Sequence, residues 1–405
     1  MTRASRLSRR QLLKGVTAAA CAAPLVVAAE AFGANDRIQL GGIGMGRRGT
    51  YVFWNLARRP GVQPVAIADV MGRRRDPLKA KGLAVYRDYR AMLARGDLDA
   101  VTVATPTQWK PLHTVAAAKA GADVYCEKPS SLTIGNGQAM VRAIRRYGRI
   151  FQHGTQQRSA GEFRFACEMV RSGRIGKVKH VEVYVTGPPH PCNLPGQPCP
   201  PDIDWNLWLG PAQWRPFNER ICLSGWEGYR EFSGGGMAGW GSHHFDMAQW
   251  GLGADDTGPV EIRPPNGRDR KHLTFVYADG TPVYHMNSMG EWAVVFVGDE
   301  GKVAVNRGVL RTWPASLMRT PTQADEVHLY RSDDHGGNFL WAIRNRRPAA
   351  ANVRIAHRTM SVCHLGNICW ELWRPLTWNP AAERFTDDDE ANRLLDRPMR
   401  SPWVL

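Results

Sequence analysis

Residues 38–49 read IQLGGIGMGRRG, and this stretch decides the fold. The apolar start predicts a strand, and the glycines at 44, 46 and 49 predict a tight turn that opens a helix packed closely on that strand. A second apolar run, residues 62–68, ends at the acidic Asp69. Such a unit binds the pyrophosphate of a dinucleotide at the helix N-terminus, and its carboxylate reads a ribose hydroxyl. The alternative is a chance glycine turn.

The residues predicted to contact this dinucleotide are Gly44, Met45, Gly46, Arg47, Arg48, Gly49 and Asp69.

Length and charge exclude several classes of protein. With 405 residues, 43% hydrophobic and 22% charged, the chain is long enough for two domains with real cores. The formal charge of +16 invites a nucleic-acid partner, but the arginines are scattered and no nucleic-acid-binding motif is apparent. We expect no nucleic-acid partner. The charge indicates either a solvated surface or a preference for anionic ligands.

The first 34 residues are expected to be a twin-arginine signal peptide. SRRQLLK at 8–14 precedes an apolar run over 16–29, and small residues follow. The sequence therefore predicts a periplasmic or otherwise exported protein. No later stretch approaches the ~20 apolar residues that a membrane span requires, so we expect no stable span after signal removal. Cys21 leaves an acylated anchor as an alternative.

The cysteines predict no metal site. Eight are present, without a CxxC pair or a Cys/His array. Cys192 and Cys199 bracket a proline-rich loop, which an oxidising compartment closes with a disulfide if the thiols meet. The alternative is two free thiols.

Two domains are expected after the signal. Residues 35–153 alternate apolar runs with helical patterns, which predicts a doubly wound parallel sheet of Rossmann type. Residues 154–405 predict an α+β domain with an open, mostly antiparallel sheet and a C-terminal tail. In the first domain we expect strands at 100–104 and 122–125 and helices at 112–120 and 133–146. In the second we expect a helix at 163–172 and strands at 178–185, 273–277, 282–287, 293–297 and 302–305.

A further signal, VYCEKP at 124–129, covers the end of the strand expected at 122–125. Ligands of doubly wound sheets lie beyond the carboxyl ends of the strands, so Glu127 and Lys128 are predicted at the nicotinamide end of the site. A surface lysine before a turn is the alternative.

The chain resembles the Gfo/Idh/MocA family, named for glucose-fructose oxidoreductase, inositol dehydrogenase and a rhizopine-catabolism protein. The resemblance covers essentially all of the mature chain and looks like an exported branch of the family. It rests on GIGMGRRG at 42–49, AGADVYCEKP at 120–129, SGRIGKV at 172–178, DWNLWLGP at 204–211, SGGG at 233–236 with GSHHFD at 241–246, and CHLGNI at 363–368.

The resemblance implies a bound NAD or NADP and redox chemistry on a secondary alcohol of a sugar, glycoside or cyclitol. Lys128 matches the family's E-K-P lysine, and His243 matches the histidine of its G-x-H-x-x-D stretch. Both are predicted catalytic residues, because a base must take the hydroxyl proton as hydride leaves carbon. Lys128 either holds the hydroxyl or is itself the base. For His243 the alternative is a hydrogen-bonded core histidine. Further cofactor contacts are expected at Thr105, Pro106, Trp109, Glu127 and Lys128, and substrate contacts at Lys128, Arg158, Trp240, His243, His244 and Asp246.

The sequence also departs from the family pattern. Many relatives carry an acidic residue four positions before the histidine, where this chain has Gly239. Asp246 or Glu231 is the candidate to replace that carboxylate. Thr107 and Lys110 stand where relatives often have Asn or Asp and His.

Six tryptophans between residues 205 and 250 predict a sugar ligand, because indoles stack on the C–H face of a pyranose. We expect at least half of them to be structural. Asp69 favours NAD, whereas the arginines at 73–75 favour NADP if they turn inward. The resemblance further implies a homo-oligomer through the C-terminal sheet. Three functions remain open: an oxidoreductase that keeps its cofactor tightly bound, a redox-neutral NAD-dependent glycoside-cleaving enzyme acting by oxidation and elimination, and a non-catalytic sugar-binding relative.

Overall fold

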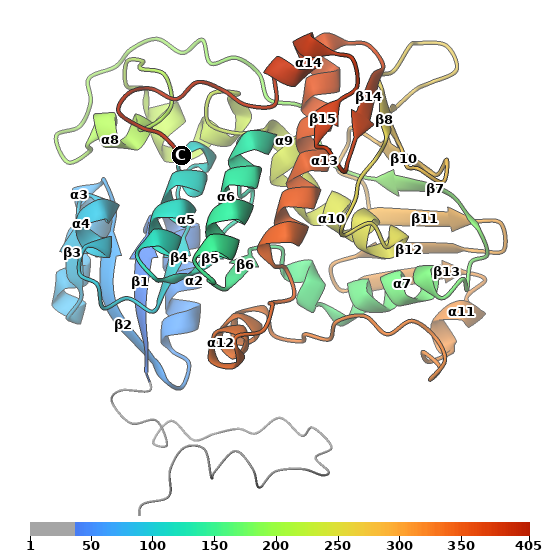
Figure 1. Ribbon diagram of the computed structural model, residues 1–405, viewed down its shortest axis with the longest axis horizontal. Coiled ribbons are helices and arrows are strands. Elements are labelled where there is room, and N and C mark those ends of the chain that lie inside the picture. The colour runs from blue at the N-terminus through green and yellow to red at the C-terminus, as the bar shows by residue number, and fades with distance from the viewer. Residues whose placement is uncertain (1–36) are drawn as a thin grey trace, which may run out of the picture.

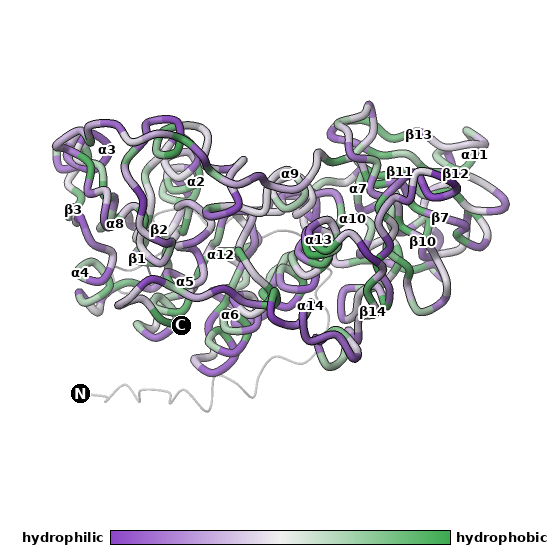
Figure 2. Tube along the Cα trace, turned by 90° about the horizontal axis from the view of Figure 1, so that it is seen from above, coloured by the Kyte–Doolittle hydropathy of each residue, from purple (hydrophilic) through white to green (hydrophobic). Residues whose placement is uncertain are grey.

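A computed structural model describes residues 37–405, which form two parts lying side by side (Figures 1 and 2). The expected signal peptide and Cys21 lie outside the described residues. Within residues 37–405, no helix is both long and apolar enough to cross a lipid bilayer.

The first part is a six-stranded parallel sheet in the order β3-β2-β1-β4-β5-β6, which confirms the doubly wound fold. The strand order reverses between β1 and β4, the place where such sheets bind ligands. Its strands are β1 (Ile38–Ile43), β2 (Val62–Ala68), β3 (Ala84–Tyr86), β4 (Ala100–Val103), β5 (Asp123–Cys126) and β6 (Phe151–His153). Its helices are α2 (Arg47–Ala57), α3 (Gly72–Arg75), α4 (Tyr89–Leu93), α5 (Lys110–Lys119) and α6 (Ile134–Arg146).

Two apolar clusters cover the two faces of this sheet. On one face, α4, α5 and α6 pack their buried side chains on Val101 and Val103. On the other, α2 packs together with α12 (His335–Asn345), a helix from much later in the chain. Phe339 and Leu340 of α12 are completely or almost completely buried there. The first part is therefore completed by a helix that its own stretch of sequence does not contain.

The second part is a nine-stranded sheet in the order β13-β12-β11-β7-β10-β9-β8-β14-β15. Its pairs are antiparallel except β7 with β10, which confirms the expected open, mostly antiparallel sheet. Its strands are β7 (Val178–Val183), β8 (Glu261–Arg263), β9 (Leu273–Val276), β10 (Pro282–His285), β11 (Val294–Gly298), β12 (Lys302–Asn306), β13 (Val309–Trp313), β14 (Leu376–Asn379) and β15 (Arg384–Phe385).

Three helices pack against this sheet and form its core: α7 (Gly161–Arg171), α10 (Gly241–Leu252) and α13 (Val353–Leu372). Helix α13 contacts both α10 and α6, so it joins the two parts, as Figure 2 shows. The remaining short helices are α8 (Trp205–Leu209), α9 (Gly235–Gly239), α11 (Ser316–Arg319) and α14 (Asp389–Arg393).

Two segments return from the second part to the first. Residues 187–232, which include α8, reach back to the first part beside α3, and the C-terminal tail crosses above α5 (Figure 1). In the tail, the ring of Trp403 lies 4.7 Å from that of Trp109. Both segments matter for the site, because they lie over the carboxyl ends of the parallel strands.

The Cys192–Cys199 disulfide does not form. Both residues are free thiols, Cys192 buried and Cys199 exposed. Cys192 packs in an apolar cluster with Trp208 and Phe217, whereas the thiol of Cys199 lies 3.8 Å from the carbonyl oxygen of Ile203. The packing of the loop thus gives the two sulfurs different partners.

Candidate active site

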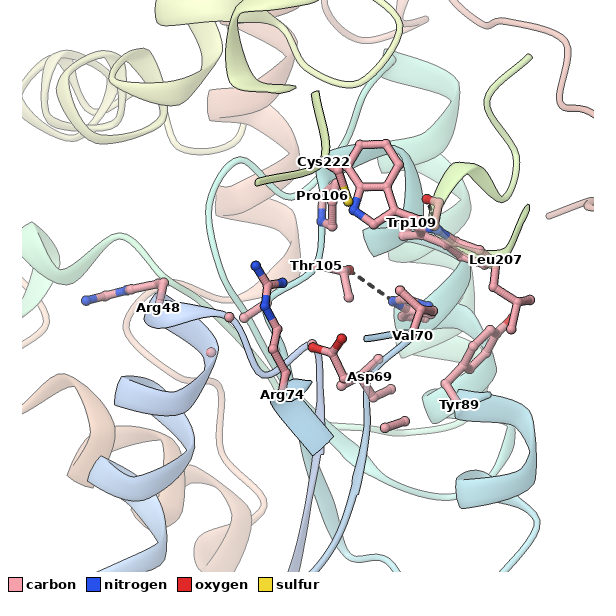
Figure 3. A pocket seen from close by; sticks show the side chains of 18 of the residues that line it. Arg48, Asp69, Val70, Arg74, Tyr89, Thr105, Pro106, Trp109, Leu207 and Cys222 are labelled. Carbon is pink, nitrogen blue, oxygen red and sulfur yellow. Dashed lines mark hydrogen bonds between the residues drawn. The ribbon is translucent and has the colours of Figure 1, made fainter. Parts of the chain in front are cut away.

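The carboxyl ends of β1, β2 and β4 open into a cavity of about 570 Å³, shown in Figure 3. We call it the nucleotide cavity. Nine of the residues predicted to bind the cofactor line it: Gly44, Gly46, Arg47, Arg48, Gly49, Asp69, Thr105, Pro106 and Trp109.

The glycine turn has the geometry that its residues imply. Gly44 has φ +85°, a left-handed conformation that side chains disfavour. A Cβ on Gly49 would stand 1.9 Å from the carbonyl oxygen of Gly44. Gly46 precedes α2 and provides no side-chain cap. The first N–H groups of α2 are therefore available to an anion such as a pyrophosphate.

Asp69 lies inside the nucleotide cavity and also holds the turn in place. Its carboxylate accepts hydrogen bonds from the backbone N–H groups of Met45 (2.6 Å) and Met71 (2.9 Å). Burial raises the pKa of Asp69, while the charge of Arg74 opposes that rise. Met45 does not line the cavity, and it contributes to the site through this backbone contact.

Of the three consecutive arginines, only Arg74 lines the nucleotide cavity. Figure 3 shows it extending over Asp69. Arg73 pairs with Asp202 at 3.3 Å, and Arg75 pairs with Asp76 at 3.2 Å. Arg74 is therefore the guanidinium of this triplet that faces a ligand at the end of β2, and Arg47, Arg48 and Arg87 also line the cavity.

The second part of the chain supplies the opposite wall of the cavity. Trp208, Cys222 and Trp226 line it, together with Leu207 and Glu227. The carbonyl oxygen of Trp208 accepts a hydrogen bond from Nε1 of Trp109 at 2.9 Å, and Trp109 stacks on His113. Residues from both parts thus enclose a ligand bound at the glycine turn.

An ion pair connects the glycine helix with the end of β5. Nη2 of Arg48 lies 2.7 Å from Oε1 of Glu127, whose side chain is 4% exposed. Glu127 also accepts a hydrogen bond from the backbone N–H of Lys128 at 3.2 Å. Glu127 does not itself line the cavity; it positions Arg48, which does.

Lys128 and His243, the two predicted catalytic residues, meet at the indole of Trp240. Nζ of Lys128 lies 5.8 Å from the centre of that ring, and the His243 ring lies 6.2 Å from it. Arg307 covers the same indole at 5.2 Å. Burial, with the positive charges of Lys128 and Arg307, holds the pKa of His243 well below its usual range. Two separate parts of the chain therefore bring these groups together.

The neighbouring His244 is held more tightly. Its Nδ1 lies 2.7 Å from the carbonyl oxygen of Tyr184, and its Nε2 lies 3.2 Å from Nη1 of Arg307. Burial lowers the pKa of His244 to about 4.

Arg158 and Asp246, both predicted substrate contacts, bind each other instead. They form an ion pair of 2.8 Å and are 2% and 1% exposed. Arg158 also pairs with Asp255, and Asp246 accepts from the hydroxyl of Thr359. Neither residue lines the nucleotide cavity, and the same is true of Lys128, Trp240 and His243. In this structure Arg158 and Asp246 are engaged in the packing of α10, and their role as substrate contacts stays a prediction.

Many relatives have an acidic residue at the position of Gly239, and neither of the two candidate carboxylates takes its place beside His243. Asp246 is occupied by Arg158, and Glu231 accepts from the backbone N–H of Cys192. The partner of His243 is the amide of Gln157, one terminal atom of which lies 2.6 Å from Nδ1. The other terminal atom lies 2.6 Å from Nη2 of Arg307, which can only donate, so we assign that atom as the amide oxygen and the one facing His243 as the nitrogen.

The six tryptophans do not share one place, and Trp214 is 65% exposed. Trp208 and Trp226 line the nucleotide cavity, Trp205 stacks on Trp208, and Trp250 is buried beneath Arg158. Trp240, 41% exposed, is the one beside Lys128 and His243. Most of the cluster is therefore structural or faces the nucleotide cavity.

Sequence reasoning missed three residues of the site. Gln157 directly precedes the predicted Arg158, but no pattern marks the glutamine itself, and Arg307 lies far from any motif. Lys110 was recognised only as a departure from the family pattern. It is 2% exposed and donates hydrogen bonds of 2.9 Å to the carbonyl oxygens of Lys128 and Pro129. Burial lowers the pKa of Lys110 to about 8.

A second cavity, of about 400 Å³, adjoins this group; Gln157 and Arg307 line it together with Arg48, Tyr125 and His335. Among residues 37–405 there is no cluster of three or more His, Cys, Asp or Glu side chains suited to a metal ion.

Fold and site together define a dinucleotide-binding protein with a second α/β domain. The model of an oxidoreductase family NAD-binding Rossmann fold, GFO_IDH_MocA, matches residues 38–155. The model of the same family's C-terminal alpha/beta domain matches residues 186–405. The chain belongs to the Gfo/Idh/MocA family of oxidoreductases.

Individual relatives are more distant. The chain is 28% identical over 222 residues to myo-inositol 2-dehydrogenase of Thermotoga maritima, covering 54% of this chain and 56% of the relative. It is 24% identical over 225 residues to a glycosyl hydrolase family 109 protein of Stenotrophomonas maltophilia, covering 51% and 48%. The chain thus spans about half the length of the curated relatives it matches.

Among solved structures, the WlbA dehydrogenase of Bordetella pertussis, in complex with NADH and UDP-GlcNAcA, has the same fold. Its TM-score is 0.61 at 18% identity, covering 85% of this chain and 98% of WlbA.

Proposed function

We propose that the protein is an NAD(P)-dependent oxidoreductase acting on a secondary alcohol of a sugar, glycoside or cyclitol. The observation that carries the proposal is that Lys128 and His243 both lie beside the indole of Trp240. Lys128 directly follows Glu127, which pairs with Arg48 on the wall of the nucleotide cavity. Family membership and the inositol dehydrogenase relative support this reaction class.

The nucleotide cavity fits a dinucleotide. The turn has no room for side chains at Gly44 and Gly49, the start of α2 is uncapped, and Arg74 faces the end of β2. When bound, the nicotinamide supplies an acceptor for hydride. In this proposal the indole of Trp240 binds the substrate. Lys128 and His243 hydrogen-bond to the substrate hydroxyl, and one of them accepts its proton.

We favour NAD as the cofactor. A carboxylate at Asp69 repels the 2′-phosphate of NADP, and only one arginine of the triplet lines the cavity. NADP is the alternative, with Arg74 as its phosphate ligand.

We further propose that the protein is exported through the twin-arginine pathway and keeps its dinucleotide bound. The signal-like sequence over residues 8–29 supports export. The wall formed by Trp208 and Trp226 supports retention, because it adds contacts that a departing ligand must break. Retention suits an exported enzyme, for which free dinucleotide is scarce.

Oligomerisation through the C-terminal sheet is also proposed. Along β7, Val181 and Val183 face the core, whereas His180, Glu182 and Tyr184 alternate with them and are only half-buried. Their face of the sheet offers a surface for a second copy. Light scattering at several protein concentrations tests this, and a monomer at every concentration would reject it.

The test of the main proposal uses protein purified from its native host. We expect denaturation to release a dinucleotide, and the reduced-nicotinamide absorbance of the intact protein to change with at least one carbohydrate in a panel of sugars, cyclitols and glycosides. Lys128→Ala should abolish the response. Lys119→Ala, at an exposed lysine that ends α5, is the matched control. A protein that neither carries nor binds NAD or NADP would reject the proposal.

A second candidate is a redox-neutral glycoside-cleaving enzyme, and the similarity to the glycosyl hydrolase family 109 protein favours it. Here a transient ketone acidifies a neighbouring C–H, elimination expels the aglycone, water adds to the resulting enone, and the hydride returns to the ketone. The same panel distinguishes the two candidates: released aglycone with no net change in reduced nicotinamide identifies the second.

A further inference from the structure

The amide of Gln157 can bridge His243 and Arg307 in one orientation only. One terminal atom of the amide lies 2.6 Å from Nη2 and 2.9 Å from Nε of Arg307, and the other lies 2.6 Å from Nδ1 of His243. A guanidinium offers only donors, so the oxygen must face Arg307. The amide NH2 therefore points at His243.

This contact determines where His243 carries its proton. Nδ1 accepts the N–H of Gln157, so it has no hydrogen of its own, and in the neutral ring the proton is on Nε2. Nε2 makes no hydrogen bond to any residue within 37–405. A proton added at Nδ1 would face the amide hydrogens, while Arg307 prevents the amide from turning over.

His244 carries its proton on the opposite nitrogen. Its Nδ1 lies against the carbonyl oxygen of Tyr184, a pure acceptor, and its Nε2 lies against Nη1 of Arg307, a pure donor. Hence Nδ1 is protonated and Nε2 is not. The two adjacent rings are therefore held as opposite tautomers by the same arginine, and His244 serves as an internal reference.

We propose that Gln157 and Arg307 are positioning residues that fix His243 as a hydrogen-bond donor to the substrate oxygen, so that the side-chain amine of Lys128 is the base. This inference rests on the proposed oxidoreductase function and assigns the roles within its site. It departs from an arrangement in which a carboxylate behind the histidine makes the imidazole a base, and position 239 of this chain has no carboxylate.

The groups facing His243 support this assignment. Lys128, Arg307, His244 and His153 act on it, and burial and these groups all disfavour its charged form. Arg307 does not release a proton at accessible pH, both nitrogens of His244 are engaged, and His153 is 1% exposed. Lys128 remains as the group able to accept a proton at Trp240.

The proposed step balances. Lys128 first releases its ammonium proton to solvent. The substrate O–H bond then breaks, and its proton passes to Nζ of Lys128, which becomes an ammonium again. The C–H hydrogen leaves with both bonding electrons for the oxidised nicotinamide, and the C–O bond becomes a carbonyl. The Nε2–H of His243 donates to that oxygen throughout and is not transferred.

The deciding measurement is ¹⁵N NMR of histidine-labelled wild-type protein at pH 7 to 8, stripped of dinucleotide and without sugar. Signals of His243 and His244 are assigned with His243→Gln and His244→Gln. We expect His243 to be neutral with its proton on Nε2, and His244 to carry its proton on Nδ1. A proton on Nδ1 of His243, or an imidazolium, would overturn the inference.

Two variants test the cause. Gln157→Glu replaces the donor with a carboxylate, so the proton should move to Nδ1 of His243 and the pKa of that ring should rise by about one to three units. Gln156→Glu adds the same charge beside Tyr125 and Glu127, its neighbours at 3.1 and 3.3 Å, and should leave the tautomer unchanged. If Gln157→Glu does not fold, Arg307→Met should release the amide and produce both tautomers. An unchanged tautomer in the folded variant would contradict the role of Gln157.

Kinetics complete the test on any substrate found. Under the proposal, kcat rises with pH as the base loses its proton, which gives the acid limb of the pH profile. His243→Gln lowers kcat but keeps this limb, whereas Lys128→Met removes it. Loss of the limb in His243→Gln would overturn the inference and leave the oxidoreductase intact. Absence of any redox response in the wild type would instead reject the proposed function, whatever the tautomer.

Discussion

Gly49 lies so close to the turn before it that the backbone itself excludes a side chain. In Gly49→Ala the new Cβ would stand 1.9 Å from the carbonyl oxygen of Gly44, and neither atom belongs to a flexible side chain. We expect a loss of about 1 to 3 kcal/mol in the free energy of unfolding and a loss of dinucleotide binding. Urea denaturation and calorimetric titration with NAD measure the two effects.

The control for this change is Gly161→Ala, at the first residue of α7. A Cβ there meets nothing within 4 Å. It should leave both stability and binding within error of the wild type. Full NAD affinity in Gly49→Ala would show that the turn yields more easily than its geometry implies.

Lys110 holds the backbone that carries Lys128. In Lys110→Met the carbonyl oxygens of Lys128 and Pro129 lose their donor, which costs about 1 to 3 kcal/mol, while removal of a buried charge offsets part of that loss. We expect a small change in Tm but a roughly 10- to 100-fold fall in kcat, because the backbone that carries Lys128 shifts.

Lys119→Met, at the exposed end of the same helix, is the matched control. If kcat were unchanged in a folded Lys110→Met protein, Lys110 would be a packing residue only.

At the scale of elements, the C-terminal tail braces the wall of the nucleotide cavity. Trp403 packs edge-on against Trp109 and lies under Arg90, at 4.7 and 4.8 Å. Arg400 anchors the tail through the carbonyl oxygens of Asn206 and Gly210, each at 2.9 Å.

Trp403→Ala should therefore speed the release of bound dinucleotide about tenfold, equivalent to about 1.4 kcal/mol, with little change in fold. Stopped-flow displacement by excess NAD measures the rate. Val404→Ala, at a side chain 78% exposed, is the control. Equal rates in both variants would separate the tail from cofactor retention.

Elements with a strong local signal were predictable. The strands β2, β4, β5 and β7 and the helices α5 to α7 lie within a few residues of the expected ranges, because their apolar patterns are regular. Strands such as β3, β8 and β15 have two or three residues and depend on their sheet partners, so no local pattern marks them.

The site divides in the same way. The glycine turn and Asp69 are local features of one strand-turn-helix unit, and the sequence locates them. Arg158 and Asp246 are 88 residues apart, and their pairing is a tertiary event that spacing cannot indicate. The same holds for Gln157 and Arg307, which meet His243 only through the packing of α10 on the sheet.

For the molecule as a whole, buried histidines determine the response to acid. Burial lowers the pKa of His113, His153 and His364 to about 3, and that of His244, His285 and His335 to about 4. As the pH falls below the ordinary value of 6.5, the unfolded chain binds protons that the folded chain refuses. Stability is therefore fully present above about pH 6.5 and is lost progressively towards pH 4.

Each such histidine contributes a slope of up to about 1.4 kcal/mol per pH unit. Urea denaturation at pH 7.5, 6.0 and 5.0 should show a steep decline, and His364→Gln should make it shallower. The pKa of Glu383 is lowered to about 2 from its ordinary 4.5, so Glu383 loses its contribution only as the pH falls from about 4.5 towards 2, below the pH values of this test. A stability that does not change between pH 7.5 and 5.0 would contradict this account.

Helix α12 packs on the first part of the molecule although it lies late in the chain, and this limits where two related proteins can be recombined. It is encoded some 180 residues after the sheet whose face it completes with α2. A chimaera made with one crossover near residue 155 would place a foreign helix against Phe53 and Leu56 and leave holes or clashes there. New substrate specificity is therefore more readily acquired by grafting the segment between α7 and α12 through two crossovers, so that the nucleotide half keeps its own distant helix.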